Sequence, residues 1–359
     1  MNFFHTALTS FLIVASIITT GSARVIRAIR PEIYPTFEDF QTTYGKRYDT
    51  PMEETHRRDV YHNNLYYIYR ENLKQHSFTL SINEFADLTS EEFFNTSTNA
   101  SHYERFLRSS TTTFNDDDLI PHNVASDAAA ATASDPPLPI AVDWTTYGAV
   151  TPVKNQAKCG SCWSFSTTGA VEGLHAIKAN DLVSLSEQQL VDCSTSYGNQ
   201  GCNGGMPIWG YEYLINEGGS CSEQSYPYTA TQNSKCNWCN PVAKISGYVN
   251  VTRYSGHELK AALVKQPVSV IIQADQRIFQ FYSSGVITYN CGSALDHAVL
   301  AVGYGVNQYG QEYFKIKNSW GTSWGDEGYV YFGADDASNA KNNGAGICGV
   351  LSMPTYPTM

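Results

Sequence analysis

The stretch KCGSCWSF, Lys158–Phe165, holds two cysteines separated by two residues. Such a pair can be a thioredoxin-like redox centre, or half of a zinc site completed by Cys236 and Cys239. Zinc is disfavoured because positions 162 and 236 lie 74 residues apart, far beyond the spacing of zinc ribbons. A redox centre is disfavoured because no strand–helix–strand unit precedes Cys159. The third possibility is that Cys162 is a nucleophile.

The residues after this pair show helical periodicity from Cys162 to Ala179, and Asn180-Asp181 ends the pattern. The apolar stripe of the predicted helix consists of Trp163, Ala170, Leu174 and Ile177. A thiol in the first turn of a helix has a lowered pKa, because the helix dipole and the N–H groups stabilise the thiolate. Cys162 would then have the reactive form of a nucleophile, but it still needs a base.

Composition excludes several classes of protein. The chain has 359 residues, of which 42% are hydrophobic and 13% aromatic, so it can bury one or two cores and is not disordered. The net charge is −11 without a dense Lys/Arg block, which argues against nucleic acid or an anionic membrane as the partner. No metal or cofactor is expected.

The first 23 residues predict a secretory signal peptide. An apolar run from Phe11 to Ile18 is too short to span a bilayer, and Gly21-Ser22-Ala23 follows it. A buried N-terminal strand or helix is the alternative. Secretion would place the nine cysteines in an oxidising compartment, where four disulfides would leave one thiol. No later apolar run is long enough to anchor the chain.

The chain divides into three parts after residue 23. Residues 24–108 are charged and Tyr-rich with helical periodicity, and residues 109–137 form a polar, Ala/Asp/Pro-rich linker. Residues 138–359 contain all the cysteines, with a helical first half and strands expected in Pro267–Ala274, His297–Gly305 and Glu312–Trp320. Composition alone leaves a removable pro-segment and a permanent helical domain equally open. A site is expected in the cleft between the two halves of the last part.

From about Leu138 to the C-terminus, the sequence resembles the papain-like cysteine proteases, in particular the cathepsin L-like branch. The resemblance rests on CGSCW at 159–163, on His297 in LDHAV and on Asn318 in KNSWG. The stretches VDW, AVTPVKNQ, SLSEQQLVDCS, GCNGG, SYPY, QPVSV and GYG add to it. It implies an α+β, papain-like two-domain fold, with a helical left domain and a β-barrel-like right domain, preceded by a helical inhibitory propeptide.

The resemblance implies a mechanism. Cys162 and His297 would form a thiolate–imidazolium pair that hydrolyses peptides through a thioester, and Asn318 would orient the imidazole ring. Trp320 would shield that contact from water, and the side chain of Gln156 with the backbone N–H of Cys162 would form the oxyanion hole. The family usually has Gly after this Gln, whereas this chain has Ala157, which would be strained if the position needs a positive φ.

The resemblance also implies disulfides and a specificity pocket. The expected disulfides are Cys159–Cys202, Cys193–Cys236 and Cys291–Cys348, and we add Cys221–Cys239 as an extra bridge. The side chains expected at the S2 pocket are all apolar: Met206, Pro207, Ile271, Leu295, Ala298 and Met353. Such a pocket would favour Leu, Phe or Val over Arg at P2. Several of these residues, Ile271 above all, could instead fill the core. No His-containing occluding loop is visible between Cys236 and Ser255, which favours an endopeptidase.

The pro-segment resembles cathepsin L-like propeptides. An ERFNIN-like pattern, with Tyr at its Phe position, consists of Glu53, Arg57, Val60, Tyr61, Asn64, Ile68 and Asn72, and a GNFD-like pattern contains Asn83, Phe85 and Asp87. A solvated helix is the alternative reading. The resemblance implies a segment that runs through the cleft opposite to substrate and is released at acidic pH, when carboxylates such as Glu53 and Asp87 are protonated.

The remaining expectations concern the surroundings of the protein. Sequons at Asn95, Asn99 and Asn250 permit N-glycosylation. The expected location is the secretory pathway, then a lysosome, a vacuole or the extracellular space. The expected partners are protein and peptide substrates and the protein's own propeptide, with cystatin-like inhibitors as candidates; a monomer is expected. Two rival functions stay open: a catalytically silent papain-like binding protein and a transpeptidase or ligase.

Overall fold

The computed structural model describes residues 34–97, 137–289 and 291–359. The expected signal peptide, nearly all of the expected linker and the sequon at Asn99 lie outside these residues. None of the helices in the three described ranges combines the length and the apolar character that a bilayer crossing requires.

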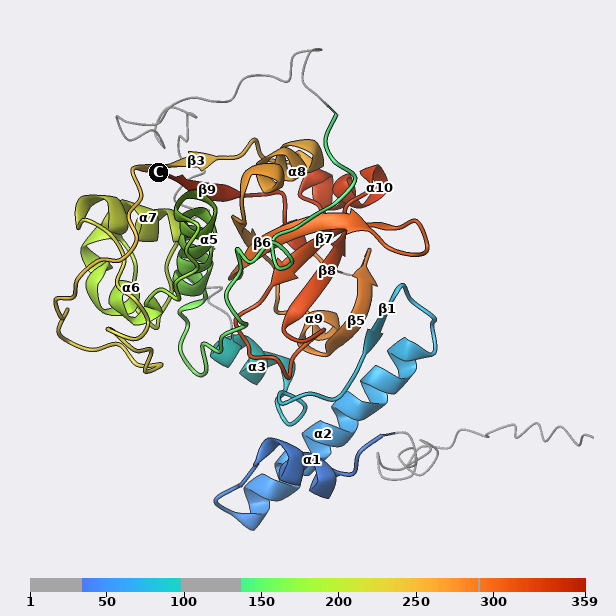
Figure 1. Ribbon diagram of the computed structural model, residues 1–359. Helices are drawn as coiled ribbons and strands as arrows, with labels where there is room; N and C mark the ends of the chain where they lie inside the picture. The colour runs from blue at the N-terminus through green and yellow to red at the C-terminus, as the bar shows by residue number, and fades with distance from the viewer. Residues whose placement is uncertain (1–33, 98–136, 290) are drawn as a thin grey trace, which may run out of the picture.

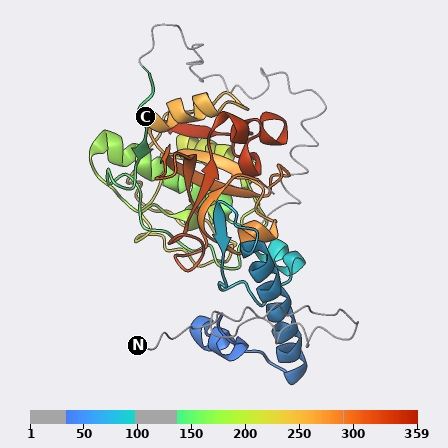
Figure 2. The same cartoon turned by 90° about the vertical axis from the view of Figure 1, so that its right-hand side faces the viewer.

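The N-terminal part is a helical unit that ends in a short strand and a further helix (Figure 1). Its elements are α1 (Phe37–Tyr44), α2 (Pro51–Asn72), β1 (Phe78–Leu80) and α3 (Ser90–Ser97). Thr36 and Asp39 cap α1 reciprocally, and Pro51 begins α2 after the N-cap Thr50. Phe37 and Phe40 pack against Tyr61 of α2. In Figures 1 and 2 this α1–α2 pair stands at one end of the molecule.

The first half of the C-terminal part is helical, as expected. It contains β2 (Val142–Asp143), α5 (Cys162–Ala179), α6 (Glu187–Cys193), the 3₁₀ helix η3 (Thr195–Tyr197) and α7 (Pro207–Asn216). The bounds of α5 are those that the apolar stripe predicted. The helix ends because Asn180 adopts the left-handed conformation with φ 55°, which Asn tolerates better than most residues. The side chains of this half form their own core, which includes Trp163, Leu174 and Leu214.

The second half is built on a sheet with flanking short helices. Its elements are β3 (Gly247–Asn250), α8 (Gly256–Lys265), β4 (Val268–Ile272), α9 (Arg277–Gln280), β5 (Tyr282–Ile287), β6 (His297–Val306), β7 (Glu312–Lys317), β8 (Tyr329–Gly333), α10 (Asp336–Asn339), η4 (Lys341–Gly344), η5 (Ile347–Gly349) and β9 (Thr355–Thr358). The three strands predicted from sequence appear as β4, β6 and β7. Strand order is β1-β5-β8-β7-β6-β4-β9-β3, and β2 pairs with β6. This path does not close, so the barrel-like half is an open sheet.

The N-terminal unit joins the sheet directly. Strand β1 pairs antiparallel with β5, with Thr79 opposite Ser284. One continuous core contains Tyr61 and Ile68 of α2 together with Phe279 and Phe281 near α9. The unit is therefore docked onto the β-rich half by backbone hydrogen bonds and by a shared apolar core.

The structure contains the four expected disulfides: Cys159–Cys202, Cys193–Cys236, Cys221–Cys239 and Cys291–Cys348. All nine cysteines lie within the described residues, and Cys162 is the cysteine outside these bridges. Cys159 and Cys162 are thus not partners, which removes both the redox and the zinc interpretations of the opening pair.

Candidate active site

Cys162 is the first residue of α5 and is buried at the face that the helix turns to the sheet. The N-cap residue Ser161 makes no side-chain cap to the helix, and its carbonyl accepts from the backbone N–H of Ser164 at 2.8 Å. The backbone N–H of Ala298 donates to the Sγ atom of Cys162 at 3.5 Å. Because Ala298 follows His297 on β6, this contact joins the two halves of the C-terminal part at the thiol.

His297 is fully buried at the start of β6 and contacts Asn318, which directly follows β7. The Nε2 atom of His297 lies 2.8 Å from the Oδ1 atom of Asn318. An amide oxygen only accepts, so Nε2 carries the hydrogen and Nδ1 keeps its lone pair. Nδ1 has no hydrogen-bond partner among the described residues. Burial lowers the pKa of His297 to about 4 although the Asn318 contact opposes this shift, so the imidazole is neutral here.

Trp320 covers this contact. Its ring stacks on the imidazole of His297 with 4.7 Å between the ring centroids and an interplanar angle of 27°. Phe85 and Phe93 of the N-terminal unit pack edge-on against Trp320 at 5.7 and 5.2 Å. The N-terminal unit therefore contacts the ring that stacks on His297.

Gln156 is buried beside Cys159 and Ser319, and both ends of its amide are held. Its Nε2 atom donates to the carbonyl of Cys159 at 3.0 Å, and its Oε1 atom accepts from the hydroxyl of Ser319 at 2.6 Å. A primary amide has two hydrogens, so one remains for a further acceptor. The next residue, Ala157, has φ 51°, which is the positive φ considered from sequence.

The six residues expected at S2 are all buried. Five of them belong to the same core cluster as Cys162: Met206, Ile271, Leu295, Ala298 and Met353. Pro207 begins α7 directly after Met206. Ile271 lies opposite Ala298 in the β4–β6 register. Five of the six side chains thus lie in the apolar core that also contains Cys162, and the backbone of Ala298 contacts the thiol itself.

The ERFNIN-like residues lie on α2 and hold the segments that follow it. The backbone carbonyls of Ala86 and Leu88 accept from Asn64, and Asn72 exchanges two hydrogen bonds with the backbone of Leu80. The remaining members also lie in the unit: Val60, Tyr61 and Ile68 are buried, and Arg57 pairs with Glu53 and Glu92.

The GNFD-like residues make contacts within the N-terminal unit and between that unit and the β-rich half. Asn83 donates to the carbonyl of Gln280 at 2.6 Å. The Asp87 carboxylate accepts from Lys46 at 3.1 Å and from the hydroxyl of Tyr48 at 2.9 Å. Of the described sequons, Asn95 lies on α3 and Asn250 ends β3, and both residues are exposed.

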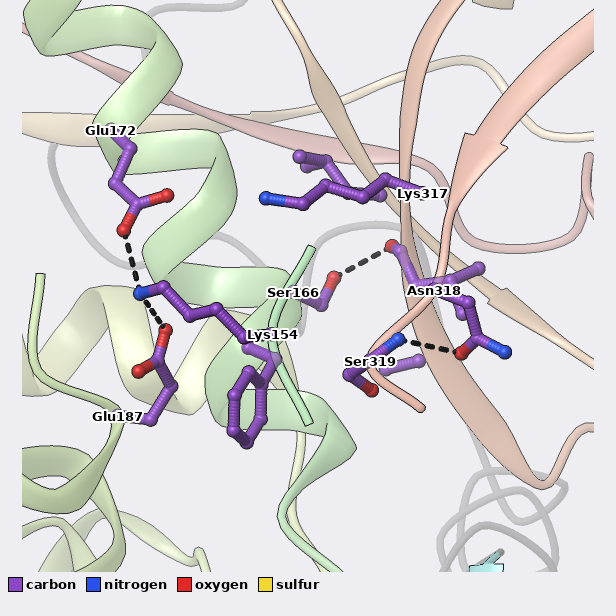
Figure 3. A pocket seen from close by; sticks show the side chains of 11 residues that line it. Lys154, Ser166, Glu172, Glu187, Lys317, Asn318 and Ser319 are labelled. Atoms are coloured by element: carbon purple, nitrogen blue, oxygen red, sulfur yellow. Dashed lines mark hydrogen bonds and ion pairs between the residues drawn. The ribbon is translucent and has the colours of Figure 1, made fainter. Parts of the chain in front are cut away.

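Two features of the site were missed from sequence. Arg277 of α9 stacks on Tyr67 with its guanidinium 3.9 Å from the ring centroid and donates to Asn64 at 2.8 Å. A group of buried charged side chains lies behind Asn318 (Figure 3). The sequence pattern indicates neither feature, because the interacting residues are distant in sequence and charged residues are ordinarily exposed.

The fold and the site define a class: a peptidase of the thiol type, with a cysteine at a helix N-terminus, a hydrogen-bonded His–Asn pair whose neighbour Ala298 contacts the thiol, and a docked N-terminal unit. Residues 138–358 match the model of the papain family cysteine proteases, and residues 37–93 match the cathepsin propeptide inhibitor domain (I29). The chain belongs to the papain family of cysteine proteases and is a proenzyme of its cathepsin L-like branch.

Similar proteins share both parts. A cathepsin L-like peptidase of Aedes aegypti is 40% identical over 96% of this chain and 98% of its own length, and digestive cysteine proteinase 3 of Homarus americanus is 41% identical over 90% and 95%. The solved proform of digestive procathepsin L 3 from Tenebrio molitor larval midgut has a TM-score of 0.74 at 35% identity and covers 90% of this chain and 97% of that one. The solved proform of the ragweed pollen allergen Amb a 11, a cysteine protease, has a TM-score of 0.77 at 35% sequence identity. The match covers 90% of this chain and 93% of that one.

Proposed function

We propose that Cys162 is the nucleophile of a cysteine endopeptidase and that His297 is its acid–base partner. The observation that supports this proposal most strongly is the hydrogen bond from His297 to Asn318, because it leaves the lone pair of Nδ1 available as a proton acceptor. Proton transfer from the Cys162 thiol to Nδ1 would give a thiolate stabilised by the N-terminus of α5. Asn318 and Trp320 orient and shield the ring.

The reaction then has two balanced halves. The thiolate attacks the peptide carbonyl, the C–N bond breaks, and imidazolium Nδ1–H gives its proton to the leaving amine. The remaining neutral imidazole takes a proton from water, the resulting hydroxide attacks the thioester, and the thiolate leaves. The Cys162 N–H and the remaining amide hydrogen of Gln156 would donate to the oxyanion.

Substrate choice is proposed from the apolar side chains that share a core with Cys162. Met206, Leu295 and Met353 present no charge to a side chain bound there. A Leu, Phe or Val side chain at P2 would remove only apolar surface from water on binding, whereas an Arg side chain would bury a cation without a partner. This favours apolar residues at P2. We propose an endopeptidase because the segment from 236 to 255 holds no His that could occlude the cleft.

The N-terminal unit is proposed to be an inhibitory propeptide that acid releases. Its docking through β1, Asn83 and the Phe85–Trp320 contact supports this role. The Asp87–Lys46 ion pair at 3.1 Å helps to hold the unit together. The proposed cleavage, which separates it from a mature part starting near residue 138, lies at the edge of the described range that begins at residue 137, and residues 98–136 before it lie outside the described ranges. A secretory destination, either acidic or extracellular, belongs to this proposal.

Hydrolysis of fluorogenic peptides that differ only at P2 tests the function. Acid-treated precursor should cleave peptides with Leu, Phe or Val at P2 at least about tenfold faster than the Arg peptide, and the Cys162→Ser precursor, processed with added pepsin, should cleave none. Equal turnover by both proteins would remove Cys162 from the mechanism. Capture of the acyl group by an added amine in preference to water would favour a transpeptidase, and silence of verified processed wild type would favour a binding protein.

A further inference from the structure

Four charged side chains surround a small cavity behind Asn318 and Ser319: Lys154, Glu172, Glu187 and Lys317, here called the ion cluster (Figure 3). The two glutamates have 1% of their side chains exposed, and Lys317 is 8% exposed. Charged residues are almost never buried so deeply unless they are paired. The chemistry proposed above uses none of these four groups, so their burial needs its own explanation.

The ion cluster is a continuous hydrogen-bonded chain. Lys317 Nζ donates to the Thr151 hydroxyl at 3.0 Å, and that hydroxyl donates to Glu172 at 2.6 Å. Lys154 Nζ donates to Glu172 at 2.9 Å and to Glu187 at 2.6 Å, which places it between the two carboxylates in Figure 3. Loss of Lys154 would therefore leave both carboxylates without the cation between them, and loss of Glu172 would remove the carboxylate that holds the Thr151 hydroxyl against Lys317.

Each of three members lies on a segment that carries a group of the active site. Lys317 directly precedes Asn318 at the end of β7, and Lys154 lies two residues before Gln156. Glu172 lies on α5, whose first residue is Cys162. In Figure 3, Lys317 extends from the strand toward this helix. The ion cluster thus joins the helical half to the sheet directly behind the site.

Stability alone does not account for this arrangement. Taking the charges out of water is costly, and apolar side chains of similar volume would fill the space without that cost. The cost appears in the pKa values: burial raises the pKa of Glu187 to about 7 and lowers the pKa of Lys317 to about 8, although an oppositely charged neighbour opposes each shift. What the charges add over apolar residues is direction, since each hydrogen bond fixes one segment relative to the next.

We propose that the ion cluster is a positioning unit that holds Asn318, and through it His297, in register with Cys162. The inference rests on the proposed roles of Cys162 and His297. A shift of about 1 Å in Asn318 would turn the imidazole away from the thiol, and displacements of this size can lower a rate by about 100-fold. The binding surface for substrate would change little, because the cluster lies behind the site.

The test compares Lys317→Met and Glu172→Gln with a matched control. Lys315→Met removes an ion pair from the same strand two residues earlier, where Lys315 contacts Asp143 at 2.8 Å outside the cluster. Full-length precursors are expressed and processed with the same small amount of pepsin, so processing does not depend on their own activity. The readouts are kcat, KM and the pH at which alkylation of Cys162 by iodoacetamide is half-maximal.

Lys317→Met and Glu172→Gln are expected to lower kcat by about tenfold or more, with KM within about threefold of wild type. The alkylation midpoint should rise toward that of an ordinary thiol, near 8.5, since a misplaced His297 no longer stabilises the thiolate. Lys315→Met should match wild type in all three. A merely structural role would not move the alkylation midpoint of folded enzyme.

Wild-type values for both cluster variants, or equal losses in Lys315→Met, would overturn the positioning role. Glu172→Gln preserves volume and decides the matter if Lys317→Met does not fold by circular dichroism. Failure of the proposed function looks different: processed wild type would then be as inactive as its Cys162→Ser variant, whereas failure of this inference alone leaves wild type active.

Discussion

At the scale of single residues, Ala157 shows how a position beside the site can be strained. Its φ of 51° lies in the region that costs a residue with a Cβ about 1–2 kcal/mol. Glycine at this position would remove that cost. Part of the gain in folding free energy would be offset, because glycine has a larger conformational entropy in the unfolded state. Ala157→Gly should therefore raise the melting temperature by a few degrees, equivalent to about 1 kcal/mol. A lower melting temperature would contradict the strain.

Gln156 carries the second prediction at this scale. Its amide is fixed by Cys159 and Ser319, so its remaining hydrogen is preorganised for an oxyanion. Gln156→Ala should lower kcat by tens to hundreds of fold, as loss of one such donor typically does, with little change in KM. Steady-state kinetics on a P2-Leu peptide measures both constants. An unchanged kcat would exclude Gln156 from the oxyanion hole.

At the scale of elements, the contact between α2 and β1 decides how firmly the propeptide holds. Asn72 donates to the Leu80 carbonyl at 2.8 Å and accepts from its N–H at 2.9 Å, and β1 in turn pairs with β5. Asn72→Ala should speed processing of the precursor at acidic pH by up to about thirtyfold, since two hydrogen bonds contribute about 2 kcal/mol. Gel analysis of timed samples measures this rate.

Asn63→Ala is the control for that prediction. Asn63 lies on the same helix and is exposed, so its loss should leave the rate of processing within about twofold of wild type. Equal rates for wild type and Asn72→Ala would mean that β1 docks without help from α2. A similar acceleration in both variants would point to a general loss of helix stability.

The elements also mark the limit of sequence reasoning. Helix α5 was predicted to the residue because its apolar stripe and the Asn180 stop are local signals. Three of the four disulfides and the Cys–His–Asn constellation were identified through resemblance, and Cys221–Cys239 was proposed from the two cysteines left over. The ion cluster could not be predicted, because Lys154 and Lys317 are brought together only by the fold and a charged side chain gives no local signal of burial. The packing of Phe85 and Phe93 on Trp320 was missed for the same reason.

At the scale of the whole molecule, the burial of His297 couples acidity to the closed precursor. Its pKa falls from 6.5 to about 4 on burial. Above pH 6.5 His297 is neutral in both the closed and the opened form, so its burial does not favour opening. As the pH falls from 6.5 toward 4, the opened form binds a proton at His297 and the closed form does not, so the closed form loses stability relative to the opened form. The coupled free energy is at most about 3 kcal/mol. Opening at acidic pH is the direction that the proposed acid activation needs.

Unfolding of non-cleaving precursors measures this coupling. Between pH 6.5 and 4, the Cys162→Ser precursor should lose up to about 3 kcal/mol more stability than the Cys162→Ser/His297→Asn double variant, because only the first can gain a proton at position 297. Denaturant titrations at a series of pH values give both curves. Parallel curves would show that His297 contributes nothing to the acid response.

The pairing of Cys162 with His297 is tested most directly by alkylation at pH 5 followed by intact-mass analysis without reduction. An ordinary thiol, with a pKa near 8.5, hardly reacts at this pH, whereas a thiolate held by imidazolium reacts readily. Processed wild type should gain one carbamidomethyl group, on Cys162, and a processed His297→Ala variant should gain none under the same conditions. Equal labelling of the two proteins, or no labelling of either, would contradict the pair.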